Sequence, residues 1–122
     1  YQIDTNRMNT KKIGDKGENF ATNILETKGY EILERNYRFK RCEIDIIALH
    51  NNLLIFIEVK ALHSFDHGYP EERVNQAKTN KIIEAAENYI YAINWQKDIR
   101  FDILSINLNE PDKYFHIEDA FY

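Results

Sequence analysis

Residues 43–62 read EIDIIALHNNLLIFIEVKAL, two apolar runs on either side of Asn51 and Asn52. Both runs are rich in isoleucine and leucine, a composition that favours buried β-strands. Asparagine tolerates a positive φ, so two adjacent asparagines are typical of a tight hairpin turn. We therefore predict an antiparallel hairpin in which His50 lies opposite Leu53.

The register of this hairpin places charged side chains opposite one another. With a two-residue turn, Asp45 faces Glu58 and Glu43 faces Lys60. The other face of the hairpin is expected to be apolar throughout, and its residues are Ile44, Ile46, Ala48, Leu53, Ile55, Ile57 and Val59. The charged face is itself apolar near the turn, so both faces should be covered. Three carboxylates and one amine are then predicted to lie within a mostly buried sheet.

These charged residues can be explained in two ways. In an ion-pair patch, Lys60 neutralises one carboxylate and the others reach water at the end of the sheet. Alternatively, Asp45 and Glu58 bind a divalent cation, because two opposed carboxylates are costly unless one is protonated or a cation binds both. Lys60 projects from the same strand face as Glu58, where its ammonium would hold a phosphate oxygen or help to deprotonate an attacking water. We predict the second arrangement, with Mg²⁺ or Mn²⁺ as cofactor. Two carboxylates, a divalent cation and a lysine are the groups that phosphodiester hydrolysis uses.

The rest of the pattern predicts an α/β fold with the element order αβββαβ and a short final edge strand. Apolar residues recur at steps of three and four over residues 10–28 and 72–93, which indicates two amphipathic helices. The expected strands and the loop after the hairpin cover Tyr30–Tyr37, Glu43–His50, Leu53–Leu62, His63–Pro70 (the loop), Arg100–Leu108 and Tyr114–Ile117. The two helices should flank a central mixed sheet.

The size and composition of the chain fit one compact domain. It has 122 residues, of which 43% are hydrophobic. We assign the domain to residues 10–122 and treat residues 1–9 as an extension, since Met8 is the only methionine and the residues before it are predicted not to be native. No apolar run is long enough for a membrane span, and the single cysteine, Cys42, allows no internal disulfide. The sequence thus predicts a soluble, cytoplasmic protein.

The net charge of −4 is distributed unevenly along the chain. Residues 1–41 hold nine Lys and Arg against six Asp and Glu, whereas the remaining residues hold seven against fourteen. A basic run without acids comprises Arg35, Arg38, Lys40 and Arg41. This run is either a solvated strand end or an edge that contacts phosphates beside the acidic centre. Because it leads directly into the strand that carries Asp45, we predict that it binds the DNA backbone.

The hairpin residues resemble a known nuclease signature. Asp45, twelve intervening residues and then Glu58-Val59-Lys60 are similar to the D-x(n)-E-x-K motif of the restriction-endonuclease-like, or PD-(D/E)XK, nucleases. The chain also resembles the bacterial YraN family of endonuclease-like proteins, through segments that span most of its length: GDKGENFA at 14–21, RNYR at 35–38, EIDIIA at 43–48, FIEVK at 56–60, RFD at 100–102 and HIEDAF at 116–121. Cys42 stands where this family usually has glycine.

The resemblance implies further site residues. In junction-resolving nucleases of this fold class a helical glutamate joins the metal site, which assigns that role to Glu18, although a glutamate near a helix start also complements the helix dipole. Related nucleases place a Gln or Lys at the start of the second helix, which would bring Gln76 and Lys78 near phosphate or the attacking water. Both would otherwise be ordinary exposed helix residues. Glu43 and Gln76 would support the metal ligands without touching the metal.

Together these residues predict a structure-selective DNA endonuclease. Asp45, Glu58 and Glu18 would ligate the metal. Lys60 would position the nucleophile, and Lys78 with the basic run would contact phosphates. No apparatus for base readout is visible, which indicates recognition of branched or otherwise structured DNA, and the junction-resolving relatives act as dimers, which implies a homodimer. The alternative is a non-catalytic nucleic-acid-binding or interaction module that retains the fold.

Other polar residues are given no part in this chemistry. Arg100 and Asp102 share a strand face and are predicted to form a local ion pair. His50 and His116 show no evident partner in the sequence.

Overall fold

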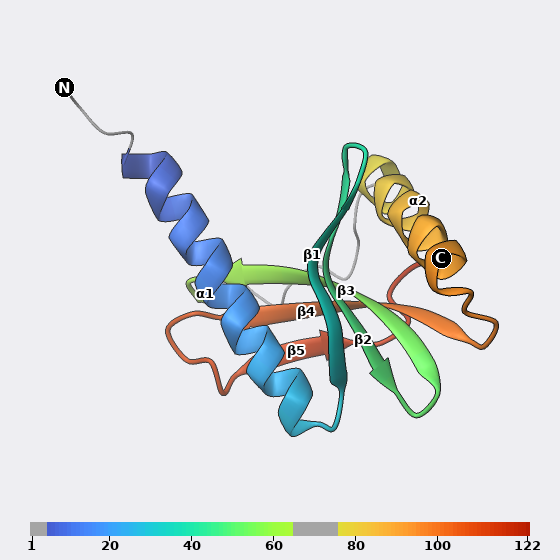
Figure 1. Ribbon diagram of the computed structural model, residues 1–122. Helices are drawn as coiled ribbons and strands as arrows, with labels where there is room; N and C mark the ends of the chain where they lie inside the picture. The colour runs from blue at the N-terminus through green and yellow to red at the C-terminus, as the bar shows by residue number, and fades with distance from the viewer. Residues whose placement is uncertain (1–4, 65–75) are drawn as a thin grey trace.

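The structure is a computed structural model that describes residues 5–64 and 76–122, with side chains described from Asp15 onward. Its elements, in chain order, are α1 (Thr5–Thr27), β1 (Glu31–Phe39), β2 (Cys42–His50), β3 (Leu53–Leu62), α2 (Gln76–Ile93), β4 (Ile99–Asn107) and β5 (Tyr114–Ile117) (Figure 1). The predicted order of two helices and five strands is confirmed.

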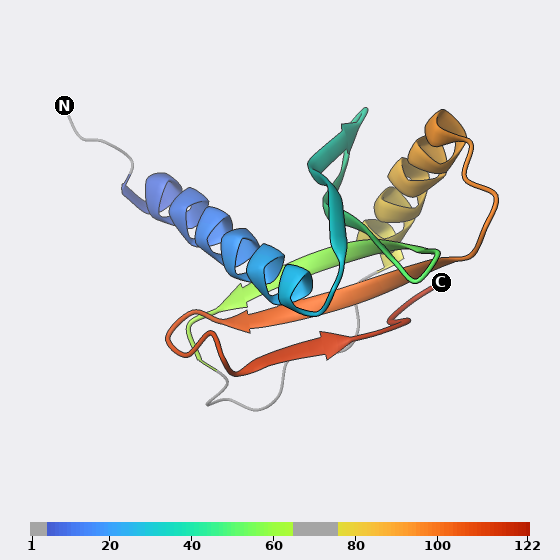
Figure 2. The ribbon, with the colours of Figure 1, turned by 60° about the horizontal axis from the view of Figure 1, so that its bottom comes forward.

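The five strands form one sheet in the order β1-β2-β3-β4-β5. β3 and β4 are parallel and all other neighbours are antiparallel, so the sheet is mixed, as predicted. A parallel pair needs a crossover connection, and the connection between β3 and β4 contains α2. The two helices pack on opposite faces of the sheet, which gives a three-layer α/β arrangement (Figure 2).

Each face of the sheet has its own apolar core, because side chains alternate between the two faces of a strand. On the α1 side, Ile57 and Leu104 pack against Leu25. On the α2 side, Phe56 and Phe101 pack with stacked rings whose centroids are 5.2 Å apart. The sheet is therefore buried on both faces, as the apolar content of residues 43–62 predicted.

The turn between β2 and β3 has the predicted geometry. Asn51 and Asn52 have φ values of 51° and 62°, the left-handed region that a type I′ hairpin turn requires. β2 pairs with β3 from His50 opposite Leu53 down to Ile46 opposite Ile57. The predicted register is confirmed over this part of the hairpin.

The prediction that Ile44 shares a face with Ile46 is wrong. The ladder between β2 and β3 ends at Ile46, and Ile44 packs in the α2-side core together with Ile47. Before Ile46, β2 pairs with β1 alone, and two-stranded ribbons twist more strongly than strands inside a sheet. Residues 35–44, which we call the arm, consequently rise out of the sheet (Figure 1).

Helix α1 begins earlier than predicted and lies unusually close to β3. It starts at Thr5. The sequence prediction placed the start near residue 10 because residues 5–9 carry no periodic apolar signal. A Cβ atom at Gly17 would lie 2.7 Å from the Cβ of Ala61, so only glycine permits this approach. The close contact brings the next residue, Glu18, to the sheet.

Helix α2 is described from Gln76 onward. The predicted helix residues 72–75 and most of the predicted loop at 63–70 lie outside the described residues. Neither described helix combines the length and the apolar character that crossing a membrane demands.

Candidate active site

The candidate active site lies where β2 separates from β3. Beyond the last ladder pair, Ile46 with Ile57, the Asp45 carboxylate accepts a hydrogen bond from the Val59 N–H, with 2.8 Å between Oδ2 and N. A buried main-chain donor needs an acceptor, and here a side chain supplies it in place of a strand carbonyl. This bond fixes Asp45 at the base of the arm.

The Asp45 and Glu58 side chains lie in contact just beyond the paired part of the hairpin, whose ladder ends at Ile46 with Ile57. Only 7% of the Glu58 side chain is exposed. Burial, the charge of Glu58 and a hydrogen bond between the two side chains raise the pKa of Asp45 from 3.8 to about 8, and the Val59 N–H only partly opposes this rise. Two carboxylates in contact do not readily both ionise, so the pair requires either a shared proton or a bound cation at neutral pH.

Among the described residues, Lys78 supplies the positive charge that contacts this pair. From the first turn of α2, its Nζ forms an ion pair with Oε1 of Glu58. Partial burial alone would lower the pKa of this amine, but the hydrogen bond and charge of Glu58, with the charge of Asp45, raise it above its ordinary value. The residue placed among the phosphate contacts by resemblance therefore touches a predicted metal ligand.

Lys60 lies on the same strand face as Glu58 but does not neutralise it. The side chain is half-buried on β3, in register with Ser105 of β4. Within residues 15–64 and 76–122, Lys60 forms no ion pair with Asp45 or Glu58. The ion-pair arrangement that centred on Lys60 is therefore not the one adopted, since Lys78 takes that position.

Glu18 reaches the same region from α1, and its side chain is 13% exposed. Its Oε2 accepts a hydrogen bond of 3.0 Å from Nδ2 of Asn36 and lies 3.5 Å from Nη2 of Arg35. Its charge also contributes to the raised pKa of Asp45. Glu18 thus lies beside the carboxylate pair, held by two residues at the base of the arm.

Asn36 is a site residue that sequence reasoning missed. Its φ of 54° is left-handed, a conformation that is uncommon inside a strand and that asparagine tolerates. The available signal was an asparagine within a strand, directly beside the cation Arg35. Strand propensity describes only the backbone, so it assigned no functional role to Asn36.

The donor set fits a hard divalent cation. Asp45 and Glu58 offer adjacent carboxylate oxygens, the ligands that Mg²⁺ prefers, and such an ion keeps water and substrate phosphate as its other ligands. Among the described residues, no group of three Asp, Glu, His or Cys side chains is gathered closely enough to hold a metal ion. The Glu18 carboxylate is directed to Arg35 and Asn36. The two-carboxylate pair is therefore the unit that would hold the ion.

The basic run divides between the site and the tip of the arm. Arg35 contacts Glu18 at the base, whereas Arg38 pairs with Glu43 at 3.6 Å in an exposed position. The predicted pairing of Glu43 with Lys60 does not form, because the β2–β3 ladder ends before it. Glu43 therefore lies on the arm and not beside Asp45.

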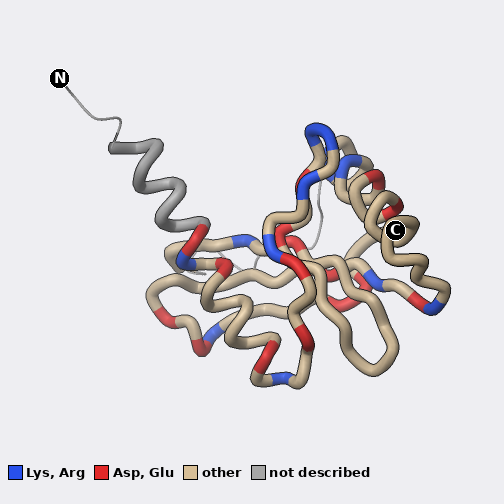
Figure 3. Tube along the Cα trace, in the orientation of Figure 1, with Lys and Arg blue, Asp and Glu red and all other residues tan. Residues whose placement is uncertain are grey.

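The tip of the arm is a cationic turn next to α2. Lys40, with a φ of 57°, and Arg41 connect the last pair of β1 and β2. Figure 3 shows lysine and arginine gathered at this tip. The hydroxyl of Tyr37 bonds to Asn88 of α2, which fixes the arm against the helix. Arg38, Lys40 and Arg41, three of the predicted phosphate-binding residues, thus lie on an arm that is held against α2.

Gln76 is exposed and forms a hydrogen bond with Asn80, one turn along the same helix, at 2.8 Å between Nε2 and Oδ1. The structure therefore separates the two candidates of the second helix. Lys78 contacts the carboxylate pair, while the described contact of Gln76 is local.

Comparison with known proteins identifies a family. The profile of the uncharacterised protein family UPF0102 matches residues 17–106. This chain belongs to the UPF0102 family. UPF0102 is the YraN family that the sequence motifs indicated. The match includes Glu18, Asp45, Glu58 and Lys78, so the residues of the candidate site lie within it.

Bacterial UPF0102 proteins match most of the chain. The protein of Cytophaga hutchinsonii is 50% identical over 97 residues, which cover 80% of this chain and 86% of that protein. The protein of Dictyoglomus turgidum is 48% identical over 114 residues, covering 91% and 95% respectively. That of Clostridioides difficile is 46% identical over 115 residues, covering 93% and 100%.

This UPF0102 chain has a second buried carboxylate, Asp102 on β4. Arg100 binds it with Nε and Nη2, each at 2.8 Å, which confirms the predicted ion pair. His116 of β5 bonds to it at 2.8 Å, and Nζ of Lys28 lies 2.6 Å from the other ring nitrogen of His116. His50 stacks on Tyr30 with ring centroids 4.3 Å apart. Both histidines that seemed unpartnered in the sequence therefore have partners.

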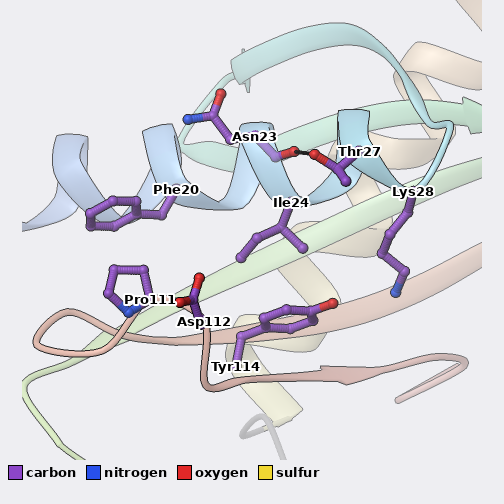
Figure 4. A pocket seen from close by; sticks show the side chains of 8 residues that line it. All are labelled: Phe20, Asn23, Ile24, Thr27, Lys28, Pro111, Asp112 and Tyr114. Carbon is purple, nitrogen blue, oxygen red and sulfur yellow. Dashed lines mark hydrogen bonds between the residues drawn. The ribbon is translucent and has the colours of Figure 1, made fainter.

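A pocket of about 510 Å³ lies between α1 and the chain that leads into β5 (Figure 4). Its apolar lining includes Phe20, Ile24 and Pro111, and its charged residues are Lys28 and Asp112. None of the predicted site residues of this UPF0102 protein lines it. The chemistry suggested by the sequence is therefore centred on Asp45 and not on this pocket.

Proposed function

We propose that this UPF0102 protein is a metal-dependent DNA endonuclease with a restriction-endonuclease-like, PD-(D/E)XK core. The observation that carries the proposal is the contact between the half-buried Asp45 and the buried Glu58. Lys60 follows on the same face of β3, as the motif requires. The order of helices and strands supports the proposed architecture.

Asp45 and Glu58 would hold Mg²⁺ or Mn²⁺, with Glu18 joined directly or through water. The raised pKa of Asp45 supports this, because a carboxylate pair that is short of positive charge is a preferred ligand for a divalent ion. When bound, such an ion supplies Lewis-acid activation of the phosphoryl group. The Val59 N–H keeps the Asp45 carboxylate oriented toward Glu58.

Lys60 would act on the attacking water. It is the lysine of the described site that forms no ion pair with the carboxylates, so its ammonium is available to hold a phosphate oxygen or to orient the attacking water by donating a hydrogen bond. Its half-buried position on β3 restricts its movement. Glu58 and Lys60 are two residues apart on one strand, which places both at the same face of the reacting phosphate.

Structured DNA is the proposed substrate, bound by a homodimer in the cytoplasm. The cationic tip, Lys40 and Arg41 with Arg38, supplies backbone contacts without base readout. At about 3.3 Å per strand residue, the tip lies on the order of 13 Å from Asp45, so it would contact phosphates several nucleotides from the cleaved one. A site with separated backbone contacts favours recognition of DNA shape.

A non-catalytic nucleic-acid-binding module is the second candidate. The observation that favours it is the ion pair of Lys78 with Glu58, which already compensates one carboxylate of the pair. In such a module the arm would bind nucleic acid while the acidic residues only stabilise the fold. Metal titration and cleavage distinguish the two candidates.

The test is a calorimetric Mg²⁺ and Mn²⁺ titration with a cleavage screen over duplex, single-stranded, flap and four-way-junction DNA. The endonuclease predicts metal binding and metal-dependent cleavage of at least one substrate, both lost in Glu58→Gln. Asp112→Asn, an exposed carboxylate remote from the pair, is the matched control and should retain both. Nucleic-acid binding without cleavage of any substrate would support the module instead.

Chemistry and binding should separate between two further variants. Lys60→Ala should lower the cleavage rate by about 10²-fold or more and change DNA affinity by about fivefold at most. The triple change of Arg38, Lys40 and Arg41 to Gln should weaken DNA binding and flatten its salt dependence, with metal affinity retained. Equal losses of cleavage and affinity in Lys60→Ala would make Lys60 a binding residue.

A further inference from the structure

The ion pair between Lys78 and Glu58 joins two residues with different freedom to move. The Glu58 side chain is 7% exposed and is confined on β3, whereas the Lys78 side chain is 50% exposed on the first turn of α2. A lysine has four rotatable side-chain bonds and loses entropy when it is held in one place. Lys78 is therefore the partner that can leave.

A divalent cation on the carboxylate pair would oppose this contact. The Lys78 ammonium touches Oε1 of Glu58, so an ion bound by Glu58 and Asp45 would bring two further positive charges close to it. Coulomb repulsion between cations is strong where water is largely excluded, and Glu58 is buried. The lysine and the ion therefore compete for the same carboxylate.

The surroundings offer Lys78 another partner when the substrate is bound. α2 lies beside the cationic tip of the arm, which would carry the DNA backbone. A phosphate near the carboxylate pair would be within the reach of a lysine that leaves Glu58. Such a phosphate would replace the Glu58 carboxylate as the anionic partner of Lys78.

We propose that Lys78 is an exchangeable counter-ion, which neutralises Glu58 in the metal-free protein and transfers to a DNA phosphate when a divalent cation binds Asp45 and Glu58. The inference rests on the metal site of the proposed function. It adds an order of events, because Lys78 contributes to DNA affinity only after the metal has displaced it. A lysine that only binds DNA would contribute with or without metal.

The first test compares Lys78→Met with Lys81→Met, an exposed lysine one turn further along α2. Mg²⁺ affinity is measured by calorimetry, and affinity for a fluorescein-labelled four-way junction by anisotropy, in EDTA and in Mg²⁺ before cleavage accumulates. Lys78→Met should bind Mg²⁺ more tightly than the wild type, since the competitor is removed. Its junction affinity should be lower by about fivefold at 0.15 M salt in Mg²⁺, the effect of one phosphate contact, and unchanged in EDTA. Lys81→Met should leave Mg²⁺ affinity unchanged and shift junction affinity equally in both conditions.

The second test uses the wild-type chain and does not depend on the folding of a variant. Lysine amines are acetylated under limiting conditions, and each modified site is quantified by mass spectrometry, with and without Mg²⁺. Mg²⁺ alone should raise the reactivity of Lys78 severalfold relative to that of Lys81. Mg²⁺ with junction DNA should lower it again.

The outcomes separate this inference from the proposed nuclease. Weaker Mg²⁺ binding in Lys78→Met, an equal loss of junction affinity in EDTA and Mg²⁺, or unchanged Lys78 reactivity on adding Mg²⁺ would overturn the exchange. Any of these can occur in a chain that cleaves DNA, which would preserve the nuclease. Conversely, the full exchange pattern in a chain that cleaves none of the four DNA substrates would support the inference and remove the nuclease.

Discussion

Asp45 and Asp102 are both carboxylates within apolar strands of the same sheet, yet their surroundings are opposite. Asp102 is fully buried and receives hydrogen bonds from Arg100, His116 and the Asp119 N–H. Burial alone would raise the pKa of Asp102, but these bonds and the Arg100 charge lower it below its ordinary value. Asp45 has one main-chain donor and faces Glu58, and its pKa rises to about 8.

The comparison shows that two carboxylates largely withdrawn from water can have opposite pKa shifts. What distinguishes them is the supply of donors and positive charge. Asp102 has a full set of partners within the chain and holds the C-terminal segment on β4 through His116 and Asp119. Asp45 and Glu58 are left short of positive charge, a deficit that a cation from outside would satisfy.

The largest expected difference is in stability. Asp102→Asn should lower the free energy of unfolding by about 3 kcal/mol, because it removes the fully buried partner of the partly buried Arg100 guanidinium and leaves it only the exposed Glu118 carboxylate. Asp45→Asn should be neutral or stabilising at pH 7, because the Asp45 carboxyl must take up a proton to lie beside Glu58 at this pH, a cost that the neutral amide does not have, and the amide keeps an oxygen for the Val59 N–H. Urea unfolding at equilibrium in EDTA measures both. Asp112→Asn, which is exposed, is the control. Comparable losses of unfolding free energy in Asp102→Asn and Asp45→Asn would contradict this distinction between the two carboxylates.

The pH dependence of stability should also differ between the two carboxylates. Asp45 has a folded-state pKa near 8, above its value of 3.8 in an unfolded chain, so the native state binds the extra proton between these values. Stability should therefore fall as the pH rises from about 4 to about 8, by at most about 6 kcal/mol. The lowered pKa of Asp102 acts in the opposite sense, and its stabilisation is lost only as the pH falls below about 4.

Urea midpoints measured in EDTA at pH 5 and pH 8 test this. The wild type should be less stable at pH 8, and Asp45→Asn should lose most of that difference. A variant with the same decline as the wild type would show that another group binds the proton.

The smallest effect concerns a single donor of the satisfied carboxylate. His116→Phe removes one of the hydrogen bonds to Asp102 and leaves the Arg100 pair in place, so it should cost about 1 to 2 kcal/mol. Thermal unfolding monitored by circular dichroism measures the change. A loss as large as that of Asp102→Asn would mean that His116, and not Arg100, is the main partner.

Much of the fold could be predicted because its signals are local. The paired asparagines specified the turn, and the apolar runs specified β3 to the residue. The face of Ile44 could not be predicted, because it depends on where β2 leaves β3 and on the twist of the arm. A strict alternation of side chains holds only while a strand remains within the sheet.

The candidate site was predictable along the hairpin but not across the fold. The predicted register brought Asp45 toward Glu58, although the ladder itself ends one pair earlier, at Ile46 with Ile57. The partner of Glu58 was assigned to Lys60 because that residue is near in sequence, whereas the packing of α2 supplies Lys78 from a distant segment. The His116 contact with Asp102 likewise depends on the pairing of β5 with β4, which no local pattern reveals.

The most direct test of whether Asp45 and Glu58 form a metal site is a calorimetric Mn²⁺ titration of the wild type, Asp45→Asn and Asp112→Asn under identical conditions. The wild type and Asp112→Asn should bind Mn²⁺ with equal affinity, and Asp45→Asn should bind it at least about 100-fold more weakly, because one carboxylate of the pair is gone. Equal Mn²⁺ affinity in all three proteins, or no Mn²⁺ binding by the wild type, would contradict the assignment of Asp45 and Glu58 as a metal site.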